Sequence, residues 1–93
     1  MIRSVRHRGL RRLFEQDNAS GLKQDQVKRI ARALFLLDNA ASPDQIDRIP
    51  GLRVHRLGGG LAGLWSMSVS GNWRIVVRFE GSDAFDVDLV DYR

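Results

Sequence analysis

The chain has 93 residues, a formal net charge of +4 and no cysteine. Its length allows one domain with one core, over residues 1–93, and the absence of cysteine excludes disulfides and thiolate-ligated metal sites. No apolar run approaches the ~18 residues of a membrane span and no signal-peptide core is visible, so we expect a soluble cytoplasmic protein with no membrane partner.

The predicted elements begin with a short edge strand at residues 2–5, followed by a helix over about residues 6–16. Leu10, Leu13 and Phe14 fall on one side of this helix. Its other side carries Arg8, Arg11 and Arg12. The polar segment at residues 17–21 ends the helix and starts a loop.

A second helix is predicted near residues 23–39. Its apolar residues recur at helical spacing and form a stripe wide enough to cover one face of a sheet. The stripe consists of Val27, Ile30, Ala31, Leu34, Phe35 and Leu37. Lys28, Arg29 and Arg32 lie off the stripe, and we interpret them as a solvated helix face, with a basic ridge beside a groove as the alternative.

A third, short helix is predicted to start with Ser42 as its N-cap and Pro43 at its first position. Gln45, three residues after Ser42, would complete a capping box. The first strand of the sheet follows at residues 52–57. Three glycines at residues 58–60 come next. No Lys-Ser or Lys-Thr pair follows them and no helix is predicted to start there, which excludes a P-loop and favours a flexible connection.

Three apolar alternations then predict three half-buried strands with one apolar face. They are Trp65, Met67 and Val69; Trp73, Ile75, Val77 and Phe79; and Phe85, Val87 and Leu89. Three-residue hairpin loops at residues 70–72 and 81–83 connect them. The antiparallel register that follows pairs Val69 with Trp73, Met67 with Ile75, Ser68 with Arg74, Phe79 with Phe85, Arg78 with Asp86, and Arg74 with Val90.

The expected fold is therefore α+β, with the N-terminal helices packed on one face of a mainly antiparallel sheet of four to five strands. Charge is distributed in blocks along this fold. Residues 1–37 hold nine Lys or Arg against three acids, and residues 51–78 hold four Arg against none. Such a balance favours a polyanionic partner such as RNA or DNA, with a solubilising surface as the alternative. A plain DNA-binding protein is disfavoured because no helix-turn-helix is evident.

Four short motifs stand in order along the second half of the chain: GLRVHRL at residues 51–57, GLWS at 63–66, NWRI at 72–75 and VDLVDY at 87–92. Together with the opening Ile2-Arg3-Ser4, they resemble the HigB branch of the RelE-type bacterial toxins over essentially the whole chain. The resemblance implies a compact RelE-like toxin of the bacterial cytoplasm, encoded beside a HigA-like antitoxin. It also implies that operator DNA is reached only through the antitoxin.

The activity that the resemblance implies is ribosome-dependent cleavage of mRNA in the decoding site, which inhibits translation. It uses no metal or cofactor, because the 2′-hydroxyl of the RNA attacks the adjacent phosphate and leaves a 2′,3′-cyclic phosphate and a 5′-hydroxyl. Such a reaction needs a group that takes the 2′ proton, cations for the growing phosphoryl charge, and an acid for the leaving oxygen.

On this resemblance, Arg74 is the candidate phosphate clamp, with an ion pair to Asp88 as its structural alternative. His55 is a candidate base or acid, against the alternative of an ordinary surface histidine. Asp91 and Tyr92 match the terminal pair of the family, where they would orient a partner, accept a proton or stack on a base, against ordinary strand-end packing. Arg93 completes the catalytic set. The expected RNA-binding residues are Arg53, Asn72, Arg8, Arg11 and Arg12.

Two positions depart from the family pattern. Gly58 stands where lysine is common, which removes one cation. Arg93 stands where histidine is common, and an arginine stabilises a phosphorane but exchanges no proton near neutral pH. These departures support a second hypothesis of a different class, an attenuated or noncatalytic toxin variant that binds antitoxin and ribosome or RNA without efficient cleavage.

Overall fold

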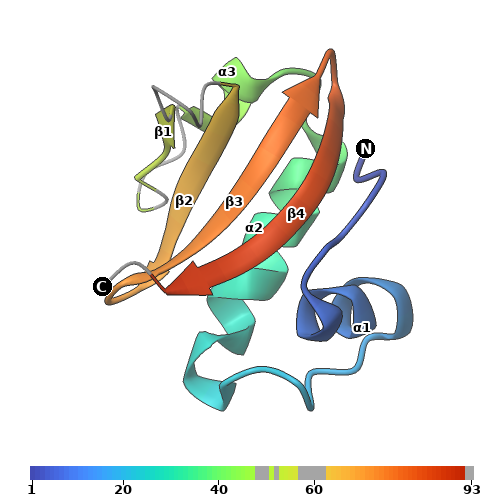
Figure 1. Ribbon diagram of the computed structural model, residues 1–93, viewed down its shortest axis with the longest axis vertical. Helices are drawn as coiled ribbons and strands as arrows, with labels where there is room; N and C mark the ends of the chain where they lie inside the picture. Colours follow the sequence, from blue (N-terminus) through green and yellow to red (C-terminus); the bar gives the residue numbers. More distant parts are fainter. Residues whose placement is uncertain (48–50, 52, 57–62, 92–93) are drawn as a thin grey trace.

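The computed structural model describes residues 1–47, 51, 53–56 and 63–91. Its elements, in chain order, are α1 (Arg8–Gln16), the short 3-10 helix η1 (Gln24–Gln26), α2 (Val27–Asn39), α3 (Pro43–Asp47), β1 (His55–Arg56), β2 (Leu64–Ser70), β3 (Trp73–Glu80) and β4 (Asp83–Asp91). The strands form one antiparallel sheet in the order β1-β2-β3-β4. Helix α2 crosses one face of this sheet, and α1 lies beside β4 (Figure 1). The predicted α+β fold is confirmed.

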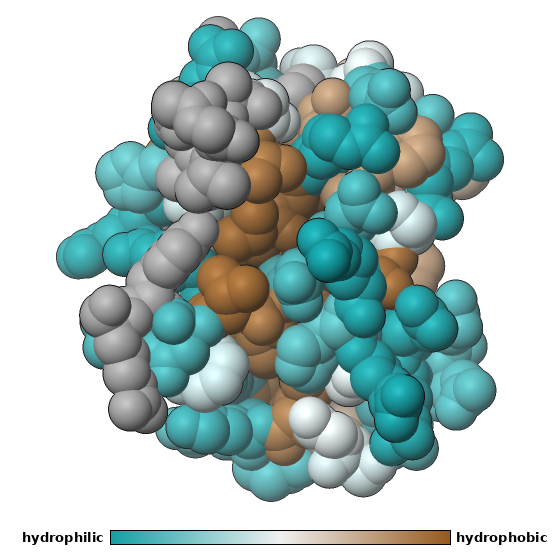
Figure 2. Space-filling model, in the orientation of Figure 1, coloured by the Kyte–Doolittle hydropathy of each residue, from teal (hydrophilic) through white to brown (hydrophobic). Residues whose placement is uncertain are grey.

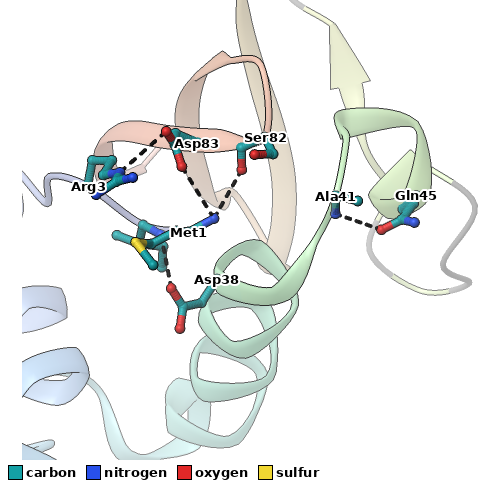
Figure 3. A network of polar contacts seen from close by, with 8 residues as sticks. Met1, Arg3, Asp38, Ala41, Gln45, Ser82 and Asp83 are labelled. Atoms are coloured by element: carbon teal, nitrogen blue, oxygen red, sulfur yellow. Dashed lines mark hydrogen bonds and ion pairs between the residues drawn. The ribbon is translucent and has the colours of Figure 1, made fainter.

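The N-terminal segment extends the sheet on the outer side of β4. Ile2 and Val5 form isolated parallel bridges with Ala84 and Val87, so the predicted edge strand is present as two bridges rather than as a continuous strand. The terminal ammonium of Met1 donates to the Ser82 carbonyl oxygen at 3.0 Å, and the Ile2 amide donates to Asp38 Oδ1 at 3.0 Å (Figure 3). The first residues are thereby attached both to β4 and to α2.

The core lies between α2 and the face of the sheet that α2 covers, which we call the helix face. Its largest fully buried members include Leu10, Ile30, Leu37, Met67 and Ile75. The predicted stripe on α2 is partly wrong, because Phe35 is 66% exposed and Ala31 is exposed, whereas Ala33 is buried. Phe35 and Ala31 instead line a groove between α1 and α2.

Local side-chain contacts fix the starts of α1 and α3. The helix begins at Arg8 rather than residue 6 because His7 Nδ1 accepts the amide hydrogen of Leu10 at 3.2 Å. At the start of α3, Gln45 Oε1 accepts from the Ala41 amide at 2.8 Å (Figure 3). This is the expected return contact of a capping box, made one residue before Ser42. None of the described helices is long and apolar enough to cross a membrane.

The first hairpin differs from the prediction only next to its turn. Ser68 pairs with Arg74 as expected, but Ser70 rather than Val69 pairs with Trp73. The turn is formed by Gly71 and Asn72, with Gly71 at φ +54°, and Val69 is the extra residue of a β-bulge.

The second hairpin differs from the prediction in the same way. Phe79 pairs with Ala84 instead of Phe85, and Arg78 pairs with Phe85 instead of Asp86. Asp86, at φ +55°, is the extra residue of a β-bulge in β4. Phe85 therefore lies on the face away from α2, the outer face, and Ala84 takes its place in the core. Beyond the bulge the predicted pair of Arg74 and Val90 is confirmed.

Candidate active site

A polar hollow of about 370 Å³ lies at the outer edge of β2. Three arginines line it from separate parts of the chain: Arg29 from α2, Arg53 from the segment before β1, and Arg74 from β3. The remaining lining residues are Gly51, Ser68, Val69, Ser70 and Gly71. No described Asp or Glu lines the hollow, so the side chains around it carry only positive charge.

The hollow lies along β2, beyond the described residues of β1. In the described part of β1 only His55 and Arg56 pair with β2, opposite Ser66 and Trp65. The Val69 carbonyl oxygen, farther along the same edge, accepts instead from Arg29 Nη1 at 2.8 Å. This bond holds an arginine of α2 at the edge of the sheet.

Arg74 lies mid-sheet between Ser68 and Val90, and its Nη1 donates to Ser68 Oγ. The ion pair with Asp88 is not formed, because no described carboxylate lies in salt-bridge range of Arg74. Asp88 Oδ1 accepts from the Leu89 amide at 2.9 Å. The charge of Arg74 is therefore held beside the hollow without a neutralising partner among the described residues.

The serine hydroxyls of the hollow are oriented as donors. Ser68 Oγ accepts from Arg74, and Ser70 Oγ accepts from Gln26 Nε2 at 2.9 Å. Because a hydroxyl carries a single hydrogen, each serine retains that hydrogen for another acceptor. The hollow thus presents N–H and O–H donors together with three positive charges, a combination that suits phosphate oxygens.

Arg78, four residues from Arg74 on the same strand and face, differs from it in its partners. Its guanidinium forms ion pairs with Glu80 at 2.8 Å and with Asp86 at 3.6 Å, although the strand register places Phe85 rather than Asp86 opposite Arg78. The hydrogen bond to Glu80 chiefly raises the pKa of Arg78, and the charge of Asp86 acts in the same direction. The group also lies 4.8 Å from the Phe85 ring centroid. The positive charge of Arg78 is therefore neutralised by Glu80 and Asp86, unlike that of Arg74.

His55 shares the outer face with Arg74. It is exposed and pairs with Ser66, which points to the same side as Ser68 because residues two apart on a strand share a face. His55 and Arg74 are therefore on one face, on either side of β2, although His55 does not line the hollow. Figure 2 views this outer face, where hydrophilic side chains surround a central apolar band.

The C-terminal candidates are only partly placed. Asp91 pairs with Trp73, one step out of phase with the pair of Arg74 and Val90, so the register directs it to the helix face. The structure does not bring Asp91 beside Arg74. Tyr92, Arg93 and Gly58 lie outside the described residues. Asn72 is exposed in the β2–β3 turn, next to Gly71 of the hollow.

The arginines of α1 lie at the opposite side of the sheet. Helix α1 lies beside β4 and α2 (Figure 1), whereas the hollow lies at the edge of β2. Arg8 and Arg12 are exposed. Arg11 Nη2 donates to the Val5 carbonyl oxygen at 2.8 Å, so this side chain holds the N-terminal segment. These three residues are not brought together with Arg74.

For Arg29 the structure favours the alternative of a basic ridge beside a groove, whereas the contribution of Gln26 was not predicted from the sequence. Arg29 was interpreted as part of a solvated helix face, but it precedes Ile30 and borders the buried stripe. A basic residue at the border of a buried stripe is the sequence signal that favours a side chain reaching over the edge of the sheet. Gln26, which is 2% exposed, gives no signal, because its contact with Ser70 joins residues 44 positions apart.

An apolar groove of about 230 Å³ separates α1 from α2 on the other side of α2. Its lining residues are Leu13, Phe14, Asp17, Ala31, Leu34, Phe35 and Asp38. Phe14 and Phe35, 37% and 66% exposed, are large apolar side chains left accessible to solvent. Within residues 1–47, 51, 53–56 and 63–91, no three His, Asp or Glu side chains gather as a metal-ligand set.

Comparison with known proteins identifies similar chains. The model of the HigB-like toxin family, described as the RelE-like toxin of the type II toxin–antitoxin system HigB, matches residues 3–93. Endoribonuclease HigB of Proteus vulgaris is 37% identical over 92 residues, which cover 99% of each chain.

Proposed function

We propose that this chain, which belongs to the HigB-like family of RelE-like toxins of type II toxin–antitoxin systems, is an endoribonuclease that cuts mRNA on the ribosome and inhibits translation. Its working place is then the bacterial cytoplasm. The observation that carries the proposal is the hollow at the edge of β2, where Arg29, Arg53 and Arg74 meet without a described carboxylate. Such a site suits the phosphodiester backbone of RNA.

In the proposed reaction, Arg74 holds the non-bridging oxygens of the scissile phosphate with its planar guanidinium. Ser68, which accepts from Arg74, adds its own O–H as a donor. The 2′-oxygen of the RNA attacks phosphorus, the bond to the 5′-oxygen breaks, and the cations stabilise the charge that grows on the phosphoryl oxygens. His55 is proposed to take the 2′ proton, since it shares the outer face. The leaving 5′-oxygen takes its proton from water and departs as the 5′-hydroxyl, because arginine exchanges no proton near neutral pH.

The remaining members of the catalytic set enter the proposal through the family pattern. Asp91 and Tyr92 are proposed to orient the RNA and the proton-transfer groups at the end of β4. Arg93 is proposed to add positive charge near the leaving oxygen. Arg53 and Asn72 are proposed to bind the RNA beside the scissile phosphate, since Arg53 lines the hollow and Asn72 adjoins it.

The test is cleavage of mRNA on programmed ribosomes by the purified protein. Arg74→Ala should lower the cleavage rate by about 10²- to 10³-fold, the usual loss when one charge-stabilising donor is removed. Arg78→Ala is the matched control, because it removes the same side chain from the same face of β3 and should cut at the original rate. Mapped ends should carry a cyclic phosphate.

Two results would reject the proposal. Equal rates for Arg74→Ala and the original protein would remove Arg74 from the site. Ribosome binding without any cuts would favour the noncatalytic toxin variant, which the substitutions at Gly58 and Arg93 suggest.

The family also implies a cognate antitoxin as partner. We propose that an antitoxin segment docks in the groove between α1 and α2, where Phe35 is 66% exposed. Arg32 lies one helical turn and Lys28 two turns before Phe35, whereas Asp17 and Asp38 line the groove itself. The segment should therefore combine apolar anchors with charged residues of both signs. Operator DNA is proposed to be bound only through this antitoxin.

Phe35→Arg should weaken antitoxin binding by at least about tenfold in a calorimetric titration, as expected for loss of a buried aromatic anchor. Gln24→Arg, an exposed position outside the groove, adds the same charge and should bind normally. Equal binding by both variants would place the antitoxin elsewhere. A gel-shift experiment with operator DNA should show a complex only when the antitoxin is present.

A further inference from the structure

A second hollow, of about 150 Å³, adjoins the first and extends it onto α2. It is lined by Arg29, Arg32, Gly51 and Ser68, and all of these except Arg32 also line the larger hollow. The two hollows therefore form one continuous trough with Arg29 between them. We call it the arginine trough, defined by Arg29, Arg32, Arg53 and Arg74.

The α2 end of the trough has donors to spare. One N–H of Arg29 bonds the Val69 carbonyl oxygen at 2.8 Å, which leaves four of the five guanidinium donors. This bond also fixes the direction of the side chain. Arg32 is exposed, and it forms no hydrogen bond or ion pair within the described part of the chain. Both groups thus keep their charge and most of their donors for a ligand.

The spacing of the two side chains suits a shared ligand. Residues three apart on a helix are surface neighbours, with Cβ atoms roughly 5–6 Å apart. Two guanidinium groups at this separation can bind the oxygens of one phosphate together. No described carboxylate lines either hollow, so nothing among these residues competes for the two cations.

We infer that Arg29 and Arg32 form a second phosphate-binding subsite, which takes a phosphate neighbouring the scissile one on a single RNA strand that crosses the edge of β2. The inference rests on the proposed function of the larger hollow. Arg29 and Arg32 act as positioning residues, because binding a phosphate remote from the reacting bond fixes the scissile phosphate against Arg74.

The experiment measures the binding of short, uncleavable 2′-deoxy oligonucleotides by fluorescence anisotropy. A probe with two phosphates should bind the full chain about tenfold more tightly than a probe with one. Arg32→Gln should abolish this gain, leave the one-phosphate probe unaffected, and lower the slope of log K against log salt by about 0.7. Lys28→Gln, an exposed cation of α2 that lines neither hollow, should behave like the original protein.

Arg29→Lys is the second variant. Lysine keeps the positive charge and can still donate to the Val69 carbonyl oxygen, so the variant should fold normally. The affinity advantage of the two-phosphate probe should fall several-fold, because lysine lacks the planar guanidinium. Equal effects of Arg32→Gln and Lys28→Gln would overturn the subsite and indicate only diffuse attraction. Cleavage on ribosomes separates the two proposals: a subsite that fails leaves cleavage by the original protein intact, whereas absent cleavage rejects the function whatever the binding shows.

Discussion

Gln26 holds Ser70 of the hollow by a hydrogen bond but has a buried amide oxygen without a hydrogen-bond partner among the described residues. The substitution Gln26→Met separates these two effects. The side chain is 2% exposed and its Nε2 donates to Ser70 Oγ at 2.9 Å. Its Oε1 is buried with no hydrogen-bond partner among the described residues. Exchanging the amide oxygen and nitrogen only moves the unsatisfied group, since Ser70 Oγ bonds one of the two. The core therefore tolerates an unsatisfied polar atom in order to hold Ser70.

The expected change in stability follows from two opposing contributions. Methionine has nearly the shape of glutamine, so cavity formation is small. Losing the bond to Ser70 costs about 0.5–1.5 kcal/mol, whereas removing a buried unsatisfied oxygen gains about 1–3 kcal/mol. We expect the free energy of unfolding to stay the same or to rise by up to about 2 kcal/mol.

Cleavage should change in the opposite direction. Without Gln26 the Ser70 hydroxyl is no longer held as a donor toward the hollow, so the rate should fall by about two- to tenfold, the value of one neutral hydrogen bond. Urea unfolding and the ribosome cleavage assay measure the two effects on the same preparation. Gln24→Met, at an exposed position of η1, should alter neither. A loss of more than about 2 kcal/mol in Gln26→Met would refute the reasoning, because it would mean that Oε1 is satisfied.

Two further predictions concern α1. Gly9→Ala should destabilise the fold by about 1–3 kcal/mol in thermal unfolding, because the new Cβ would lie 2.7 Å from the Gly21 carbonyl oxygen; an unchanged melting temperature would show that the loop after α1 yields freely. Arg8→Gln combined with Arg12→Gln should weaken ribosome binding and reduce its salt dependence without unfolding the protein, since both side chains are exposed; the same salt dependence as the original protein would remove α1 from the ribosome contact. Arg11 is left unchanged in that variant because it bonds Val5.

The strand register explains why the sequence predicted the correct face for Arg74 and the wrong face for Phe85. A three-residue loop and a two-residue turn followed by a one-residue bulge shift the register by the same amount. Beyond the bulge both give the same pairs, so Ser68, Arg74 and Val90 fall where the alternation predicts. Between turn and bulge the phase is reversed, which moves Phe85 to the outer face. Nothing in a local alternation distinguishes the two arrangements.

The hollow itself depended on contacts that no local pattern carries. Helical spacing places Arg29 beside the core stripe, but its bond to Val69 joins it to a strand 40 residues away in the sequence. Phe35 fits the apolar stripe as well as Leu34 does, yet α1 leaves it in a groove. The sequence thus predicted the fold, the face of Arg74 and the basic character of the site, whereas the identity of its third arginine required the tertiary structure.

The pairing of the N-terminal segment with β4 bears on when this protein can become active during its own synthesis. The Met1 ammonium meets Ser82 across a separation of 81 residues. Closing a loop of that length costs about 2 kcal/mol more than closing one of ten residues. Helices α1 and α2 leave the ribosome first, but the strands that bury their apolar residues are made last. Folding should therefore be completed only after β4 has emerged, so a chain still being translated carries no assembled arginine trough with which to cut the message that encodes it.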